Sequence, residues 1–401
     1  MAAADALSGR NVWLGLGKQA AFGTPVAPTK FYEVTDIGGL LEEYESKKSD
    51  RRVGSRFKPL GFKTSKKVPL TFTVEVNAEN IGLLLTLGLG SDSVVAAGTA
   101  YKHTISTADI LPYFTAWAST DLVADTDLAD TVHQLINCKV ISIKFDATVD
   151  DVLKCVVEAV GTARYPAFNS KVGIACAGAS GNANLTGFAS VVGLAPGMNV
   201  TGTGIGASAK ILSVDYVNKT CVLSVNNTGV VSSITASVVP PAFPASRSLY
   251  MKAEESQGKI EIGAAVGSLV EFDEGTEFHF TLTNGVAPDT RIDTTPFASA
   301  LREGDSEMTG SMKAMYNRNT LVEIKAFQAG TVRAIRFSAI STELAATGQP
   351  FKVVLTTDKA RYSGAPTSWD PDVISTDAPF DIEKTTSYPI IEVVNTDVLA
   401  Y

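Results

Sequence analysis

The sequence has few cysteines, no excess of positive charge and no long apolar run, and each lack excludes a class of protein. Its four cysteines among 401 residues are widely spaced (Cys138, Cys155, Cys176 and Cys221). We expect them to be reduced core thiols of a protein made in the cytosol, with a zinc site as the disfavoured alternative. No stretch approaches the roughly 18 apolar residues of a membrane helix. Met1–Leu7 lacks the basic and apolar regions of an export signal, so we expect none.

The charge balance and the motifs exclude further functions. Asp and Glu number 42 against 34 Lys and Arg, a net charge of −8, which argues against general affinity for nucleic acid. Gly15–Lys18 resembles a phosphate-binding loop, but Val12 and Gln19 stand where such a loop needs Gly and Ser or Thr. Asp121–Asp130 lacks the glycine and the final glutamate of a calcium loop. His103, His133 and His279 are isolated. We therefore expect no catalytic, cofactor or metal site.

A long internal repeat is the most informative feature present. In Val68–Gly90, apolar and polar residues alternate up to Glu75, which predicts a strand with one buried face. Asn77 or Asn80 is placed to cap the short apolar helix that follows, and Gly90 to end it. Met308–Gly330 repeats this order, with Asn317 as the cap. Every position keeps register over an offset of 240, from Asn77 to Asn317 and from Gly90 to Gly330.

The remaining sequence divides the chain into four parts. Ile136–Thr148 and Val152–Thr162 predict an amphipathic β-hairpin with its turn at Asp150–Asp151. Lys171–Val239 is almost free of charge, alternates as strands do and has no helix signal, which predicts a small β domain. We expect a disordered start at 1–10, a first domain at 11–166, an inserted β domain at 167–245 and a second domain at 246–401. Lys30–Asp36 is expected to be one strand.

The sharpest electrostatic feature is the basic stretch Lys47–Lys67. It can be an interface arm that docks on an acidic surface of a neighbouring copy, a solvated loop, or a DNA contact, and we favour the interface. The residues expected in this inter-ring or subunit interface are Lys47, Lys48, Arg51, Arg52, Arg56, Lys58 and Lys63.

In its order of features the sequence resembles the tail tube proteins of tailed bacteriophages. The matching segments are Leu14–Pro28, the charged loop after the second strand, Thr71–Val76 leading into Asn80–Gly90, Phe280–Gly285, Glu307–Met312, and the helix end at Ala329–Gly330. The resemblance covers roughly 11–165 and 247–395. The residues between resemble small Ig-like β domains that decorate virion proteins. Single-copy members of the family have neither the repeat nor this insert.

The resemblance implies a mainly β fold, with two duplicated tube-type β-sandwich or half-barrel domains, one flanking helix on each, and the inserted β domain. It implies a structural virion protein, made in the host cytoplasm, whose stacked rings form the hollow tail tube through which phage DNA passes. Two units per chain predict a homotrimeric, pseudo-hexameric ring, with a homohexamer as the alternative. Partners would be copies of the chain and other tail proteins (tape measure, terminator, baseplate or tip), without membrane insertion.

The polar strand faces are candidates for the lumen of such a tube. A negative lumen repels phosphates and lets DNA slide. The positions expected to face it are Thr71, Thr73, Glu75, Ser142, Asp146 and Glu277.

Two other functions are weighed against the tube. A virion surface or receptor-binding protein would use the insert to contact cell-surface glycan, but Phe188 and Tyr216 are the only large aromatic residues there. An enzyme such as a peptidoglycan hydrolase would need a Cys/His or a Glu/Asp site, and the sequence indicates neither.

Overall fold

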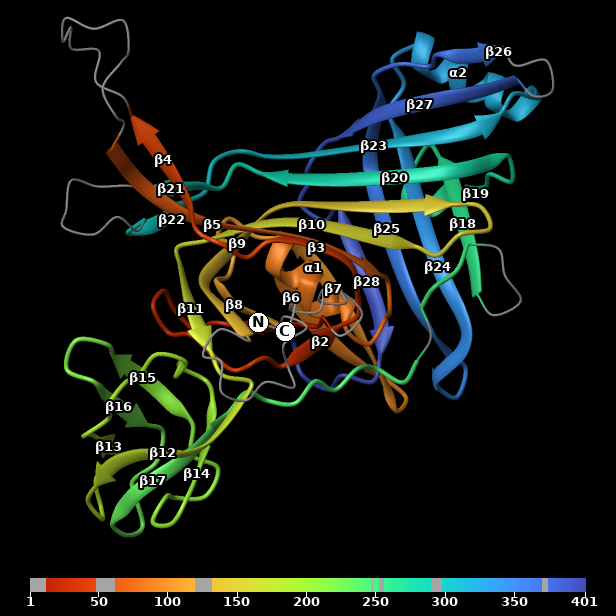
Figure 1. The fold of residues 1–401 in the computed structure, drawn as a ribbon. Coiled ribbons are helices and arrows are strands. Elements are labelled where there is room, and N and C mark those ends of the chain that lie inside the picture. Colours follow the sequence, from red (N-terminus) through yellow and green to blue (C-terminus); the bar gives the residue numbers. More distant parts are fainter. Residues whose placement is uncertain are drawn as a thin grey trace, which may run out of the picture.

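The computed structural model describes residues 12–47, 62–119, 132–246, 248–251, 256–289, 298–369 and 374–401. Over these residues the chain consists mainly of antiparallel strands, with two α-helices (Figure 1). The prediction of a mainly β fold is confirmed. Neither helix in this part of the chain has the length and apolarity to cross a membrane.

Seven strands form what we call the main sheet. In spatial order they are β3 (Val34–Gly39), β5 (Phe62–Glu75), β10 (Lys154–Gly161), β9 (Val132–Thr148), β20 (Gly275–Asn284), β23 (Ser306–Met315) and β27 (Ile374–Ile382), each antiparallel to the next. Leu70, Phe72 and Val74 are buried, whereas the alternating Thr71 and Thr73 are not. Because successive side chains of a strand point to opposite sides, the sheet has one apolar and one polar face.

A second layer of strands covers the apolar face of the main sheet. Its order is β6 (Gly90–Ala97), β7 (Ala100–Thr107), β28 (Ile390–Asn395), β25 (Gln349–Tyr362), β24 (Arg333–Ala346), β18 (Ser256–Gly263) and β19 (Val270–Glu271). The 3-10 turn η3 (Val266–Ser268) links β18 to β19. Phe278 of β20 stacks on Phe337 of β24 with ring centroids 4.7 Å apart. Figure 1 shows β24 running across the direction of β20 and β23.

Helix α1 (Ile81–Leu89) lies between the two layers, with all nine residues buried. Its glycines let neighbours approach closely, because a Cβ at Gly82 would overlap the ring of Tyr401 and one at Gly88 would overlap Ile143. Asn77 accepts a hydrogen bond from the backbone N–H of Glu79 through Oδ1, and Asn80 makes no side-chain cap. The expectation of a flanking helix is therefore wrong for α1, since β6, β7 and β28 cover its outer side.

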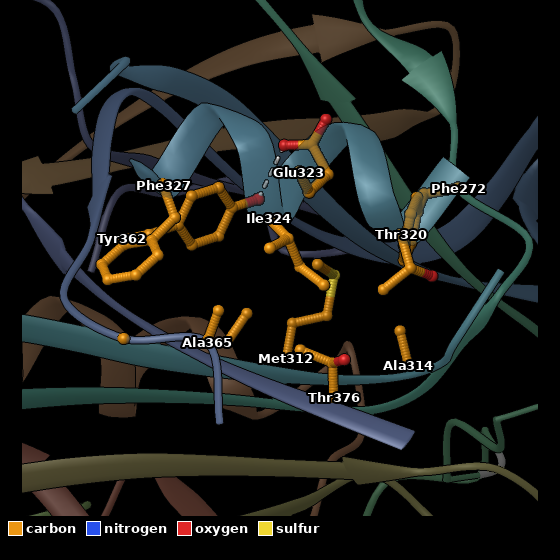
Figure 2. A pocket seen from close by; sticks show the side chains of 12 residues that line it. Phe272, Met312, Ala314, Thr320, Glu323, Ile324, Phe327, Tyr362, Ala365 and Thr376 are labelled. Carbon is orange, nitrogen blue, oxygen red and sulfur yellow. Dashed lines mark hydrogen bonds between the residues drawn. The ribbon is translucent and has the colours of Figure 1, made fainter. Parts of the chain in front are cut away.

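Helix α2 (Arg318–Gln328) does flank the fold. Asn317 caps it as predicted, accepting from the N–H groups of Asn319 and Thr320 at 2.8 and 3.1 Å. Figure 2 shows α2 over a small cavity, with Glu323 accepting a hydrogen bond from the hydroxyl of Tyr362 at 3.1 Å. Of its residues only Thr320 and Ala326 are buried, so most of α2 remains at the surface.

The hairpins that precede the two helices share their register. In the first, Asp36 lies opposite Thr73 and Gly38 opposite Thr71. In the second, Glu277 lies opposite Lys313 and His279 opposite Ser311. The residues of β5 and β23 differ by 240 positions and those of β3 and β20 by 241. Both hairpins also have a β-bulge at the same place, before Asp36 and before Glu277. The sequence repeat therefore coincides with two hairpins of the same geometry.

The inserted region packs against a side sheet. That sheet comprises β1 (Leu14–Lys18), β2 (Lys30–Tyr32), β8 (Phe114–Ser119), one end of β9 and β11 (Ala163–Ala167). The insert has one sheet of β12 (Ser170–Gly178), β17 (Val231–Ser237) and β14 (Asn199–Thr201), and another of β13 (Asn184–Leu185), β16 (Thr220–Leu223) and β15 (Ile211–Asp215). Trp13, Phe31 and Trp117 share one apolar cluster with the insert. The expected strand Lys30–Asp36 is divided into β2 and β3.

All four cysteines are buried and none is disulfide-bonded. Burial raises the pKa of the Cys221 thiol to about 12, and it also raises the pKa of Cys138 and Cys155. These thiols therefore stay protonated at neutral pH, and the prediction that the cysteines lie in the core is confirmed.

We expect Leu84→Ala, in buried α1, to lower the free energy of unfolding by about 2–5 kcal/mol, because it leaves a cavity between the two layers. Urea unfolding followed by circular dichroism measures the change. The matched variant Leu344→Ala removes the same atoms from a side chain that is 57% exposed and should cost about 0.5 kcal/mol or less. Equal losses in the two variants would contradict the internal position of α1.

Candidate functional site

The polar face of the main sheet is continuous across its seven strands. One row of paired residues crosses it from Gly38 through Thr71, Glu158, Ser142 and Thr283. Residues that pair directly across antiparallel strands point to the same side of the sheet. All six positions expected from the sequence to line a lumen, which are Thr71, Thr73, Glu75, Ser142, Asp146 and Glu277, lie on this one face.

Acidic groups predominate on the polar face. In the part of the face between the row of Thr71 and the row of Glu277, its carboxylates are Asp36, Glu75, Asp146, Glu158, Glu277, Glu307, Asp377 and Asp381, and its lysines are Lys144, Lys154 and Lys313. The face also carries His279. Eight carboxylates against three lysines give it a net negative charge, which is the property that a phosphate-repelling surface requires.

A chain of polar contacts spans the centre of this face, where β9 meets β20. His279 Nδ1 lies 2.7 Å from Asp146 Oδ1, and Lys144 Nζ lies 2.9 Å from the same carboxylate oxygen. On the other side of His279, Glu277 contacts its Nε2 at 3.5 Å and pairs with Lys313 at 2.8 Å. These contacts join β9, β20 and β23, so the chain's two halves are connected on the polar face as well as through the backbone ladder.

The pKa values of Glu277 and Lys313 are shifted in opposite directions. The hydrogen bond from the Lys313 ammonium is the main cause that holds the pKa of Glu277 below its usual range. The same bond raises the pKa of Lys313. Both groups are therefore charged at neutral pH, and the negative charge of Glu277 persists well into acid.

The described ends of the basic stretch belong to a two-stranded arm between β3 and the rest of β5. Strand β4 (Glu43–Lys47) pairs with the first part of β5, and Lys47 and Lys63 belong to this ladder. At its base, Lys66 pairs with Glu42 at 2.8 Å and Lys67 with Glu43 at 3.5 Å. The other expected interface residues, Lys48, Arg51, Arg52, Arg56 and Lys58, lie outside the described residues. Figure 1 shows β4 projecting from the body on the same side as β21 (Ala287–Asp289) and β22 (Ala300–Arg302).

A crevice of about 460 Å³ lies at the opposite end of the main-sheet strands. It is lined by residues 147–150, 251, 258–260, 271–278, 315 and 337, and its carboxylates are Asp150, Glu271, Asp273, Glu274 and Glu277. Lys259 is also in the lining and pairs with Glu271 at 2.7 Å. The arm contains the part of β5 that precedes Val68, whereas the crevice lies beyond the other end of the strand. The basic arm and the acidic crevice are therefore at opposite ends of the main sheet.

The other residues singled out in the sequence, among them His103, Phe188 and Tyr216, pack within the fold. His103 pairs with Asp92 in the second layer, with both side chains fully buried. Phe188 of the insert is buried, and Tyr216 stacks on Tyr165 while donating its hydroxyl to the Leu194 carbonyl at 2.8 Å. Neither aromatic residue therefore offers a platform for glycan. Within the described part of the chain, no three His, Cys, Asp or Glu side chains are grouped as metal ligands are, and Asp121–Asp130 lies outside it.

The six positions expected at a lumen did not include several charged residues of the polar face. Lys154, His279 and Lys313 belong to it because of register, since they lie opposite Glu75, Asp146 and Glu277, and Lys144 lies between Ser142 and Asp146 on β9. The alternation of Glu277, His279, Thr281 and Thr283 with buried Phe278, Phe280 and Leu282 was the signal for β20. The crevice had no sequence signal, because six separate stretches of the chain form it.

Comparison with known proteins gave one family. The model of the family described as phage tail tube protein matches residues 9–383 of the chain. Among curated proteins, no match was found.

We expect Lys313→Gln to lower the free energy of unfolding at pH 7 by less than about 1 kcal/mol, because the pair with Glu277 is partly solvated. The pKa of Glu277 is lowered in the folded state, so the pair stabilises the protein above the ordinary pKa of 4.5 and is lost as the pH falls through the lowered value.

The difference between Lys313→Gln and the parent protein should therefore disappear in acid, as measured by urea unfolding at a series of pH values. Lys325→Gln, at an exposed position of α2, is the control. A difference that stays constant through the acid range would show that Lys313 acts by packing and not by charge.

Proposed function

The chain belongs to the family of phage tail tube proteins and is a structural protein of the virion tail, and from this premise we propose that three copies close each ring of the tube. The observation that carries the proposal is the repeated hairpin, with its common register and bulge, followed each time by an asparagine and a helix. We interpret the two hairpins as parts of two tube-type units, 11–166 and 246–401, that arose by duplication. Three chains then supply six units in a closed, pseudo-sixfold arrangement.

In this ring the polar face of the main sheet lines the lumen. The opposite face is already occupied by α1 and the second layer, so the polar face is the one left to meet solvent. Its eight carboxylates outnumber its three lysines, which favours the passage of DNA without tight binding. A basic wall would instead bind the DNA, because its lysines and arginines would displace the counterions of the phosphates. The diameter of a barrel grows with its strand number, and several chains together supply enough strands for a wide channel.

Rings stack through the basic arm. A head-to-tail contact between unlike surfaces extends without limit, as a tube requires. The arm and the acidic crevice lie at opposite ends of the main-sheet strands, which supports such a contact between successive rings. Because Lys66 and Lys67 at the base already have acidic partners within the chain, we assign the contact to Lys48, Arg51, Arg52, Arg56 and Lys58, together with Lys47 and Lys63.

The insert, 167–245, is placed on the outside of the tube as a separately folded domain. It packs on the side sheet through Trp13, Phe31 and Trp117, and Figure 1 shows its strands away from β23 and β27. An outward insert leaves the polar face open for the lumen. At the two ends of the tube, the free surfaces of the last rings would meet the other tail proteins.

Electron cryomicroscopy of assembled tubes tests the ring. Each chain has two hairpin units and one insert, so we expect every ring to show six similar inner repeats and three outer densities. Six outer densities per ring would mean six chains and would overturn the trimer. A variant lacking the insert is unsuitable as a control because the insert shares an apolar cluster with the side sheet, so the intact chain is used.

The triple variant Arg51→Glu, Arg52→Glu and Arg56→Glu tests the stacking contact. We expect it to fold as the parent protein does but to form few or no tubes, because like charges would then face each other at the acidic crevice. The control carries the same change of charge on the insert, as Lys171→Glu, Lys210→Glu and Lys219→Glu. Negative-stain microscopy counts the tubes, and normal tube formation by the arginine variant would remove the arm from the contact.

A further inference from the structure

The chain contains a junction between its two halves that can serve as a template. Residues 142–148 of β9 pair with residues 277–283 of β20, with Asp146 opposite His279. These strands are more than a hundred positions apart, and each borders its own half of the main sheet. This internal junction shows how the last strand of the first half of the main sheet, β9, pairs with the first strand of the second half, β20.

The correspondence between the halves extends beyond the first hairpin. In the first half, Thr73 of β5 lies opposite Val156 of β10, and Lys154 of β10 lies opposite Asp146 of β9. In the second half, Lys313 lies opposite Asp377 of β27, and Ser375 of β27 lies opposite Ser368. Thus β10 corresponds to β27 at an offset of 221, and β9 corresponds to the end of β25 and β26 (Thr367–Trp369) at an offset of 222.

An irregularity at the same place supports this alignment. In the first half, the register shifts after Glu158, so that Ala159 lies opposite Val140. In the second half, the backbone N–H of Ser363 bonds to the carbonyl of Pro379, and Phe380 lies opposite Tyr362. Val140 and Tyr362 differ by 222 positions, as Asp146 and Ser368 do. The four-strand set β3–β5–β10–β9 therefore has the same register as β20–β23–β27 and the segment 360–369.

In the described chain, β3 and β26 correspond to the two strands of the internal junction, but each has no partner strand along one edge. Strand β3, the counterpart of β20, pairs only with β5, and β26, the counterpart of the end of β9, pairs only with β27. Edges of this kind expose backbone donors and acceptors that another chain can use. Both edges belong to the same sheet at its two ends, so one copy presents β3 where the next presents β26.

We propose that neighbouring chains in a ring join by antiparallel pairing of β3 with β26 of a second copy, in the register of the internal junction, with Gly38 opposite Ser368. The register follows from the offsets, since Gly38 corresponds to His279 and Ser368 to Asp146. The flanking pairs are then Ile37 with Trp369 and Gly39 with Thr367. This inference rests on the proposed closed ring and specifies the contact that closes it.

Disulfide trapping in assembled tubes tests this register. Paired residues on antiparallel strands have Cα atoms about 4.5–5.5 Å apart, within the range that a disulfide bridges. A Cβ at Gly38 has open space around it, and the native cysteines are all buried. We expect Gly38→Cys with Ser368→Cys, oxidised in the tube, to give covalent dimers and trimers on a non-reducing gel, with no larger species.

Three controls fix the interpretation. Asp146→Cys with His279→Cys should link within each chain and give no multimer, because it reports the internal junction. Ile37→Cys with Ser368→Cys should link poorly, since a shift of one residue turns the side chain to the other face. The single variants Gly38→Cys and Ser368→Cys, assembled as an equal mixture, should give dimers and nothing larger, and only contact between two chains can produce them.

The outcomes separate the junction from the ring. Tubes that form without any cross-link, in both the double variant and the mixture, while the internal control links, would overturn the β3–β26 junction and leave the tube function standing. A series of cross-linked products that extends to six chains would support the junction and overturn the three-chain ring. Efficient linking at Ile37 instead of Gly38 would show a junction in a different register, contrary to the proposal.

Discussion

The register of the main sheet is the constraint on which the other features of the structure depend. Its seven strands form one hydrogen-bonded sheet. A shift of one residue in the pairing of any two neighbouring strands would exchange the apolar and the polar face of every strand beyond that pair. The apolar face fixes the register, because Phe72, Phe145, Phe278 and Phe380 must all enter the same core. The polar face is then determined as well, so the carboxylates of distant strands form one surface without contributing to the core.

The sequence was sufficient for those features that depend on local pattern. Alternation in β5, β9 and β20 predicted which residues share a face, and the offset of 240 between Asn77 and Asn317 pointed to the repeated strand, cap and helix. It failed where tertiary contacts decide. Helix α1 has the apolar residues of a flanking helix, but the second layer covers its outer side, and Gly82 and Gly88 allow that close packing. The pairing of β9 with β20 joins segments that no local signal connects.

The two helices show how similar hairpins can lead to different surroundings. Both follow a strand of the main sheet and an asparagine that binds the backbone N–H two residues later. The sequence Ile81–Leu89 has no charge and is wholly buried, whereas Arg318–Gln328 contains charged residues and lies mostly at the surface. Glu323 holds α2 to its neighbours through Tyr362 and Arg333. The two helices therefore differ in their surroundings, while the two hairpins keep the same register.

The internal junction between β9 and β20 has a consequence for how a ring would assemble. Half of the six joints in the proposed ring are made within a chain as it folds, so a ring needs two associations between chains, against five for six separate units, before its last joint closes. Each association costs translational and rotational freedom, and covalent connection replaces that cost at the joints within a chain by a high local concentration. Nucleation of a ring would consequently depend on a lower power of subunit concentration than for a protein with one unit per chain.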